Sequence, residues 1–233
     1  MNKKIDTIAV IPDGNRRWGR SHLVSISNVY TLGIKKFLDF SEWCYNYGIR
    51  NIVVWGLSTE NIGRSSEELD ALFSAYIGFL DDVKTFKRLK EKKARLILVG
   101  NRTLLPKTLL ASFERLERQT KDFSERKVFA LFGYGGKDDI MHAAYSIAKS
   151  ALGKKRMIRI NENSFKRHLQ SNDVPDIDLV IRTSGELRLS GFMSWQTAYS
   201  ELYFCKKYWP AFTKRDLDVA LSDYFKRERR FGI

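Results

Sequence analysis

The chain has 233 residues, of which 43% are hydrophobic and 29% are charged. These values are ordinary for a globular protein and predict one domain spanning residues 1–233. No stretch approaches the roughly 18 consecutive apolar residues of a membrane span, and the five-residue apolar run near the amino terminus does not fit a signal peptide. Cys44 and Cys205 match no metal-binding spacing, and none of the three histidines lies in a metal pair or a nucleophile motif. We therefore expect a cytoplasmic protein without a Cys or His metal site.

The formal net charge of +14 favours anionic partners. The densest basic run covers residues 84–95 and contains seven lysines and arginines. A solvated helix face is the plainest interpretation of this run, and peripheral contact with an acidic membrane is the best functional one. Nucleic acid is not expected as a partner, because the run has few interleaved aromatic residues and the chain has no zinc-finger, helix-turn-helix or ribonucleoprotein motif.

Short β-branched runs alternate with longer amphipathic runs along the chain. This pattern predicts, in chain order, a strand at 7–11, a helix at 33–47, a strand at 51–57, a helix at 69–93, strands at 96–99 and 128–132, a helix from about 138, strands at 179–181 and 201–204, and a helix at 217–230. Such alternation is typical of an α/β domain with a mostly parallel sheet and helices on both faces.

Polar loops follow four of the predicted strands, at residues 13–18, 58–61, 133–137 and 182–190. Ligands of open parallel sheets bind outside the carboxyl ends of the strands. We therefore expect these loops to meet at one rim and to form one site.

The first loop has the composition of a diphosphate site. Gly14 in a turn before a helix presents free backbone N–H groups, and Arg16 and Arg17 add charge-assisted hydrogen bonds to phosphate. Asp13 would repel a phosphate unless Mg²⁺ lay between them. The alternative is an ordinary strand-to-helix turn with Asp13 as its cap. The loop is neither a Walker loop nor a dinucleotide-binding fingerprint.

The loop at 182–190 could bind a second diphosphate. Arg182 and Arg188 supply two guanidinium groups, Ser190 supplies a hydroxyl, and Gly185 allows a tight turn. The alternative is a pair of surface arginines neutralised by Glu186.

Large apolar residues accompany these loops. The predicted helix at 69–93 carries Phe73, Tyr76, Phe79 and Leu80, and Phe192, Trp195 and Tyr199 follow the second arginine loop. Such residues often form core alone, but anionic sites beside an apolar wall also suit a phosphorylated lipid.

The motifs resemble those of a known family. Residues 8–18 (IAVIPDGNRRW) resemble the first signature of the cis-prenyltransferases, the family that contains undecaprenyl diphosphate synthase. Residues 57–61 with Arg64 and Glu68 resemble the second signature, residues 134–140 the third, and residues 178–190 and 195–204 the last; the ending at 229–232 also fits. The resemblance covers nearly the whole chain, in order and at the family's spacing.

The resemblance implies a six-stranded, mostly parallel sheet, a homodimer or heterodimer, and Mg²⁺-dependent condensation of an allylic diphosphate with isopentenyl diphosphate to give cis double bonds. By position, Asp13 would hold Mg²⁺ with Glu201 and assist departure of the allylic diphosphate. The allylic diphosphate would contact Gly14, Asn15, Arg16, Arg17, Trp18 and Arg64. Isopentenyl diphosphate would contact Arg182, Arg188 and Ser190, and the polar side chains near the condensing carbons would be Ser58 and Asn61.

The chain departs from the family pattern at five positions, one of which is Val29 in place of a glycine. Ile26 and Tyr30 replace an arginine and a histidine on the allylic side, while Ile62 and Gly133 replace a tryptophan and an asparagine. The altered allylic side leaves open an irregular condensation, transfer to another acceptor, or a non-catalytic subunit of a heteromeric enzyme. The bulk of Phe73, Tyr76 and Phe79 favours a product of short to medium length.

Overall fold

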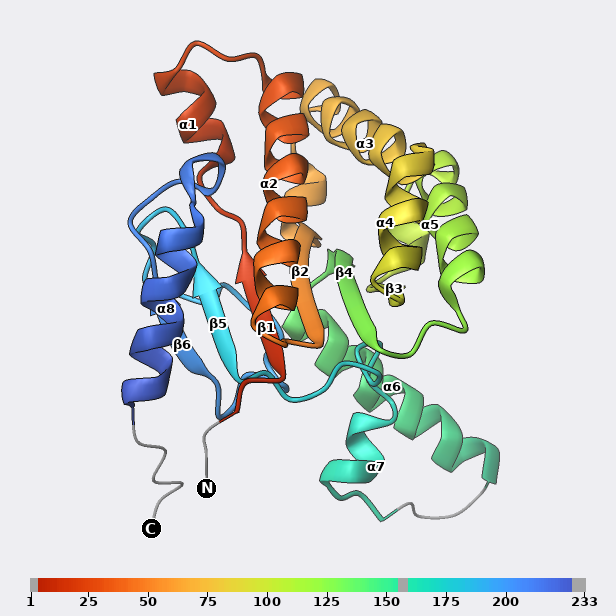
Figure 1. The fold of residues 1–233 in the computed structure, drawn as a ribbon. Helices are drawn as coiled ribbons and strands as arrows, with labels where there is room; N and C mark the ends of the chain where they lie inside the picture. The colour runs from red at the N-terminus through yellow and green to blue at the C-terminus, as the bar shows by residue number, and fades with distance from the viewer. Residues whose placement is uncertain (1–3, 155–158, 228–233) are drawn as a thin grey trace.

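Six strands form one sheet, and each neighbouring pair is parallel (Figure 1). A computed structural model of the chain describes residues 4–154 and 159–227. The strands are β1 Thr7–Ile11, β2 Asn51–Ser58, β3 Ala94–Val99, β4 Arg126–Tyr134, β5 Leu179–Arg182 and β6 Glu201–Phe204, in the spatial order β3-β4-β2-β1-β5-β6. All six predicted strands are confirmed, with bounds extended by at most two residues at either end.

Eight α-helices and three short 3₁₀ helices connect and cover these strands in the described part of the chain. They are α1 Asn15–Ser21, α2 Ile26–Asn46, α3 Ser66–Asp81, α4 Val83–Glu91, α5 Lys107–Thr120, α6 Gly136–Lys154, α7 Glu162–Lys166 and α8 Lys214–Lys226, with η1 Glu60–Gly63, η2 Arg102–Leu104 and η3 Trp209–Ala211.

The single helix predicted at 69–93 is wrong, because the chain breaks at Asp82 into α3 and α4. Asp82 has extended backbone angles, and its carboxylate accepts a hydrogen bond of 2.9 Å from the backbone N–H of Lys84. An aspartate that caps a helix in this way starts a new helix in place of continuing the old one. The helix predicted from Gly33 begins earlier, at Ile26, where the Ser25 hydroxyl accepts from a backbone N–H in the first turn.

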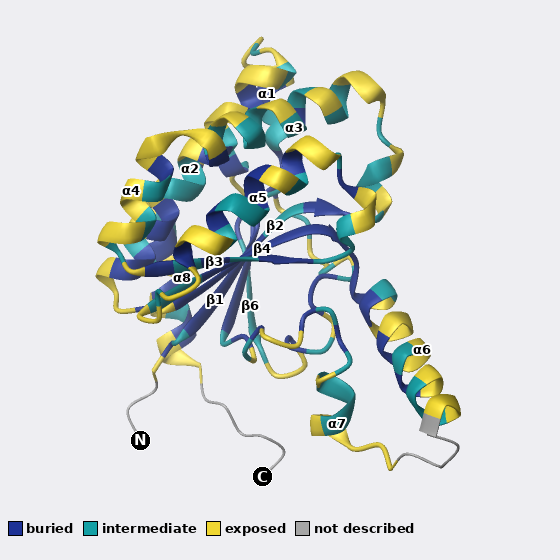
Figure 2. Ribbon diagram, turned by 90° about the vertical axis from the view of Figure 1, so that its right-hand side faces the viewer, coloured by how far each residue is buried: buried dark blue, intermediate teal, exposed yellow. Residues whose placement is uncertain are grey.

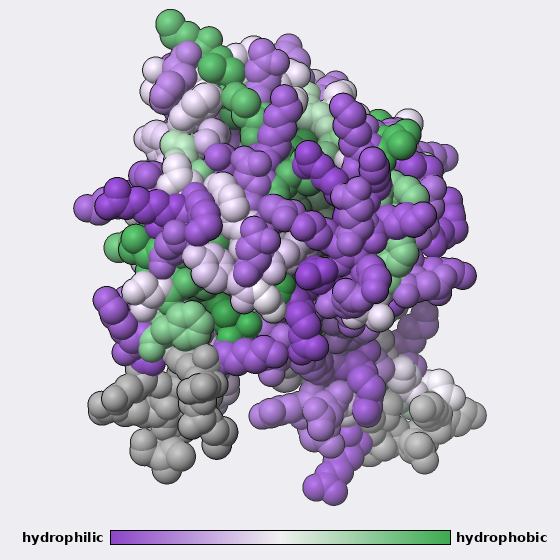
Figure 3. All heavy atoms as spheres, viewed as in Figure 1, coloured by the Kyte–Doolittle hydropathy of each residue, from purple (hydrophilic) through white to green (hydrophobic). Residues whose placement is uncertain are grey.

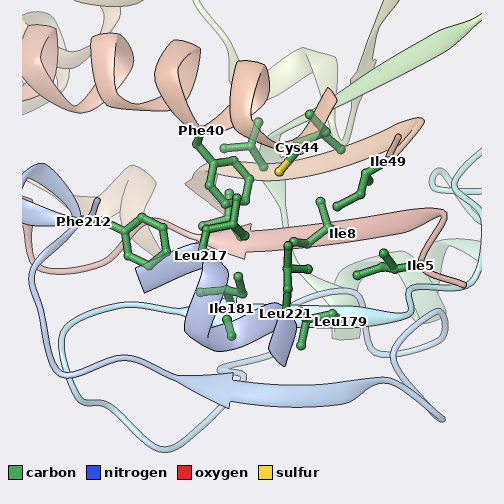
Figure 4. Close-up of a cluster of buried hydrophobic side chains, with 14 of the residues drawn as sticks. Ile5, Ile8, Phe40, Cys44, Ile49, Leu179, Ile181, Phe212, Leu217 and Leu221 are labelled. Carbon is green, nitrogen blue, oxygen red and sulfur yellow. The ribbon is translucent and has the colours of Figure 1, made fainter. Parts of the chain in front are cut away.

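Helices α2 and α8 cover one half of one sheet face, and α3, α4 and α5 cover the other half of that face. Figure 4 shows the first half, where Ile8, Leu179 and Ile181 of the sheet meet Phe40 of α2 and Leu221 of α8. On the opposite face the packing comes from the irregular chain between α7 and β6, which includes Phe192 and Met193. The four inner strands β1, β2, β4 and β5 are mostly buried on both faces, as Figure 2 shows, and this explains their continuous apolar runs.

Helices α6 and α7 extend away from the body of the sheet (Figures 1 and 2). Within the described residues, no helix is long and apolar enough to cross a membrane.

Candidate active site

A cavity of about 650 Å³ lies at the carboxyl ends of β1, β2 and β5. It brings together most of the predicted site residues, which lie far apart in the sequence. Those that line it are Asp13, Gly14, Asn15, Arg16, Arg17, Ser58, Asn61, Arg64, Arg182, Arg188 and Ser190. β1 lies between β2 and β5, so the loops after these three strands meet at one edge of the sheet.

Asp13 and Arg182, which both line the cavity, form an ion pair. Arg182 is 6% exposed, and its Nη2 donates to Oδ2 of Asp13 at 2.9 Å. The backbone N–H of Gly14 donates to Oδ1 of the same carboxylate at 2.6 Å. Burial raises the pKa of Asp13, but the hydrogen bonds from Arg182, Ser184 and Gly14 outweigh it, and the pKa lies below the ordinary value. Asp13 is therefore a carboxylate at neutral pH.

Gly14 allows this close approach of the first loop to its neighbours. Its φ is +93°, and a Cβ at this position would lie 2.5 Å from Cδ1 of Tyr208 and 3.0 Å from Cβ of Ser184. A side chain here would be strained and would also push the two loops apart.

The loop after β5 folds around the guanidinium of Arg182. Nη1 of Arg182 donates to the backbone carbonyl of Arg188 at 2.5 Å and to the hydroxyl of Ser190 at 3.0 Å. Arg182 thus fixes the position of the two other residues predicted to bind the second diphosphate.

Arg17 joins the loops after β1 and β5. Its Nη1 donates to Glu186 at 2.9 Å, and its Nη2 donates to Ser184 at 2.8 Å. Glu186 also pairs with Arg188 at 2.7 Å. Hydrogen bonding by Arg17 and the charge of Arg188 lower the pKa of Glu186. The predicted pairing of Glu186 with the arginines is therefore present, and it holds two cations at the mouth of the cavity.

Charged side chains also meet on the side of the cavity that faces α2 and α3. Glu68 pairs with Arg64 at 3.0 Å and with Arg16 at 3.3 Å, and it accepts a hydrogen bond of 2.6 Å from the hydroxyl of Tyr30. Nη1 of Arg64 also donates to the Tyr30 hydroxyl at 3.2 Å. Of the two departures on the allylic side, Tyr30 lines the main cavity, whereas Ile26 lines a separate hollow between α1 and α3.

Three buried polar atoms of cavity residues have no hydrogen-bond partner among the described residues. They are Oδ1 of Asn15, Nε of Arg64 and Nε of Arg182. Buried polar groups are nearly always paired in native proteins, so unpaired atoms around one cavity indicate a polar ligand. Two of the three are cationic donors, which suits an anion.

Ser58 and Asn61 lie at the end of β2 and in η1. The hydroxyl of Ser58 accepts from the backbone N–H of Asn61 at 3.2 Å, and this bond holds the two residues together at the cavity wall.

The inner part of the cavity is apolar. Its lining includes Ile34, Phe37, Leu57, Leu72, Tyr76 and Trp209. Of the aromatic residues predicted for this wall, only Tyr76 lines the cavity; the others, Phe73, Phe79, Phe192, Trp195 and Tyr199, do not. Ile34, Phe37 and Leu72 were not predicted, because at helical spacing they look like ordinary core.

Two predicted residues lie outside the cavity. Trp18 does not line it and stacks on His22 with ring centroids 4.3 Å apart. Glu201 begins β6 and pairs in register with Leu179, so it lies at the amino ends of the strands, whereas Asp13 follows their carboxyl ends. A four-residue strand separates these two edges by about 10 Å. Within one chain the structure does not bring Glu201 to Asp13, and Glu201 pairs with Arg227 at 2.9 Å. The predicted terminal residues 229–232 lie outside the described residues.

Few of the described residues could bind Mg²⁺. Among the described residues, no cluster of three or more His, Cys, Asp or Glu side chains could hold a metal ion. Mg²⁺ is commonly bound by one or two carboxylates together with substrate phosphates, and Asp13, ionised and beside the arginines, matches that arrangement.

An α/β fold with a diphosphate-type site and an apolar inner wall defines a class of enzymes that act on phosphorylated lipids. The family model described as "Putative undecaprenyl diphosphate synthase" matches residues 11–232. The chain belongs to this family, and this confirms the resemblance found in its motifs. It is therefore an enzyme of the cis-prenyl diphosphate synthase type, which transfers prenyl groups.

Individual proteins support the assignment along the whole chain. The isoprenyl transferase of Thermotoga maritima is 38% identical over 97% of this chain and 95% of its own length. The tritrans,polycis-undecaprenyl-diphosphate synthase (geranylgeranyl-diphosphate specific) of Sulfurisphaera tokodaii is 40% identical over 97% of this chain and 87% of its own length. A crystal structure of lavandulyl diphosphate synthase from Lavandula x intermedia in complex with dimethylallyl diphosphate superposes with a TM-score of 0.92 at 31% identity, covering 98% of each chain.

Proposed function

We propose that the protein condenses an allylic prenyl diphosphate with isopentenyl diphosphate, in the presence of Mg²⁺, to form a (Z)-polyprenyl diphosphate. The observation that carries the proposal is the arrangement around Asp13. One arginine-rich side comprises Arg182 and Arg188, the other comprises Arg16 and Arg64, and an apolar cavity lies behind both. The family and its relatives favour this reaction over irregular condensation, transfer to another acceptor and a non-catalytic role.

The proposed reaction breaks the C–O bond between the allylic carbon and its diphosphate. The double bond of isopentenyl diphosphate supplies the electron pair for the new C–C bond, and a proton then leaves the adjacent carbon to form the new double bond. Negative charge grows on the departing diphosphate, and guanidinium groups stabilise this charge in a water-poor site. Mg²⁺, held by Asp13 and the diphosphate oxygens, would supply further charge stabilisation.

The residues on the allylic side would be Gly14, Asn15, Arg16, Arg17 and Arg64. Two of them, Asn15 and Arg64, carry the unpaired buried atoms Oδ1 and Nε. Arg182, Arg188 and Ser190 would hold isopentenyl diphosphate, because Arg182 fixes the other two at hydrogen-bond distance. Ser58 and Asn61 would lie near the reacting carbons. On binding, a diphosphate would replace Glu186 as the partner of Arg188.

A dimer is the proposed assembly. Helix α6 projects from the body and exposes Met141, Tyr145, Ala148 and Leu152, which are spaced for one helix face (Figure 2). A contiguous apolar stripe of this kind is typical of a protein interface. Sedimentation of the protein and of Tyr145→Lys would test this: the variant should be monomeric, and a wild-type monomer would contradict the proposal.

Peripheral membrane contact is proposed through α4. Lys84, Lys87, Arg88 and Lys90 are exposed on it, and Val83 at its start is 79% exposed. Co-sedimentation with phosphatidylglycerol vesicles, but not with phosphatidylcholine vesicles, is the expected result, and equal recovery with both would contradict it.

The enzymatic proposal is tested by product analysis. The purified protein is incubated with Mg²⁺, labelled isopentenyl diphosphate and dimethylallyl, geranyl, farnesyl or geranylgeranyl diphosphate in turn, beside Asp13→Ala. Labelled (Z)-polyprenyl diphosphates that disappear in the variant are expected. No product with any primer would overturn the proposal, and a product without the head-to-tail linkage would replace it with irregular condensation.

A further inference from the structure

A second cavity, lined by apolar and polar residues, adjoins the active-site cavity at Phe37. Its volume is about 440 Å³, and it lies between α2, the end of α3, α4 and the first residues of β3 and β4. Among the described residues, Phe37 alone lines both cavities. The two hollows therefore meet at one side chain.

The two cavities follow one another along the same face of the sheet. Val54 lines the first cavity and pairs in register with Ala130, and Val128, two residues earlier on β4, lines the second. Residues two apart on a strand face the same side and lie about 6.6 Å apart. The cavities thus run from the carboxyl ends of the strands toward their amino ends.

Helix α3 shows the same progression. Tyr76 lines the first cavity, whereas Phe79 and Leu80, three and four residues later, line the second. Positions at this spacing lie one turn apart on one helix face. Figure 3 shows apolar residues between hydrophilic side chains in the region between α2 and α3.

We propose that Phe37 is the residue that determines product length, as a partition between two segments of one prenyl tunnel. The growing chain fills the first cavity from the diphosphate end and stops where its tail meets the Phe37 ring. Phe37 is half-buried and packs against two core clusters, one toward α8 and one toward α5, so neighbouring side chains hold the ring in place. The inference rests on the proposed condensation reaction.

The chemistry of the second cavity suits a hydrocarbon tail. Its inner lining includes Phe79, Leu80, Leu89, Leu96 and Val128. Charged residues also line it, namely Asp39, Glu42, Arg88, Glu91 and Lys92, and Lys92 pairs with Glu42 at 2.6 Å. A tail that passed Phe37 would contact the apolar side chains, and the buried hydroxyls of Ser41 and Thr85 would keep their hydrogen bonds to backbone carbonyls.

The test compares the product lengths of the wild type and Phe37→Ala under identical conditions, with excess isopentenyl diphosphate. The variant should make products longer by one or more isoprene units. Leu38→Ala is the matched control, because Leu38 lines only the second cavity, and its products should keep the wild-type length. Adding Ser41→Leu to Phe37→Ala should shorten the products again, because Ser41 also lines the second cavity.

Unchanged or shorter products from folded Phe37→Ala would overturn the proposal. If this variant does not fold, Phe37→Leu decides by the same criterion, since it shortens the side chain with a smaller loss of packing. Absence of product from the wild type itself would count against the condensation reaction and would identify that failure separately.

Discussion

The hydroxyl of Tyr30 on α2 donates a hydrogen bond of 2.6 Å to the carboxylate of Glu68 on α3. Tyr30 stands where the family pattern described above leads us to expect a histidine, and it lines the active-site cavity. Burial and the hydrogen bond to Glu68 raise the pKa of Tyr30 well above its ordinary value, so the phenol stays neutral through the physiological range. Through its contacts with Glu68 and Arg64, we expect Tyr30 to act as a positioning residue for the proposed allylic side.

Tyr30→Phe should raise the KM for the allylic diphosphate about fivefold, the equivalent of one hydrogen bond of about 1 kcal/mol. The KM for isopentenyl diphosphate should stay constant, because Arg182 and Arg188 lie on the other side of Asp13. Steady-state kinetics with each substrate varied in turn measure both constants. Tyr47→Phe is the matched control, since its hydroxyl donates to Asp218 on the surface. Equal changes in both KM values would contradict the positioning role.

Asp13→Asn keeps the shape of the side chain and removes its charge. It should lower kcat about a hundredfold or more, because the group that would hold Mg²⁺ beside the leaving diphosphate is lost. The Mg²⁺ concentration required for half-maximal activity should rise as well. Single-turnover rates over a Mg²⁺ titration measure both effects, with circular dichroism as the check on folding. Wild-type Mg²⁺ dependence in the variant would remove Asp13 from the metal site.

The sequence predicts the sheet well because its strands are buried on both faces. The run TIAVI of β1 is buried at all five positions, so no polar residue interrupts its apolar signal. The boundaries of helices are harder to predict from the sequence. Apolar spacing continues across Asp82, and the break depends on backbone angles and a capping bond that periodicity does not report. Helix α5 carries Leu109, Phe113 and Leu116 at helical spacing, so its existence is predictable from the sequence.

The polar half of the site is predictable because it follows strand ends, where parallel strands bring loops together. The apolar half is not, because Phe37 on α2 has the same spacing as a core residue, and only the three-dimensional arrangement places it between two cavities. The prediction that places Glu201 with Asp13 shows a different limit of reasoning from sequence. Its motif is specific, yet motif spacing carries no information on the edge of the sheet at which the residue lies.

Asp216 near the start of α8 should give a pH-dependent contribution to stability. Burial raises its pKa, but hydrogen bonds from Thr213 and Lys207 outweigh burial, and the pKa lies below its ordinary value of 3.8. The ionised carboxylate therefore stabilises the fold fully above that pH, and the stabilisation disappears as pH falls through the folded-state pKa. Asp216→Asn should cost about 1 kcal/mol at pH 7 and progressively less below about pH 4.

Urea unfolding of the wild type and Asp216→Asn at pH 7, 5, 4 and 3 checks this expectation. Asp70→Asn, at an exposed position of α3, is the control and should leave stability unchanged at every pH. A difference between the wild type and Asp216→Asn that grew toward low pH would have the wrong sign for a lowered pKa.

Substitution of Gly33 on α2 should change the catalytic efficiency and the thermal stability in different ways. A Cβ at this position would lie 2.8 Å from Oδ1 of Asn15, the cavity atom without a partner among the described residues. Gly33→Ala should therefore displace the Asn15 amide and lower kcat/KM for the allylic diphosphate. Alanine favours the helix by up to about 1 kcal/mol over glycine, so the Tm should stay level or rise despite the contact.

Gly78→Ala on α3 is the matched control, because a Cβ there meets no atom within 4 Å. It should raise the Tm and leave kcat/KM unchanged. A Gly33→Ala enzyme with full activity would mean that the Asn15 amide does not contact the substrate.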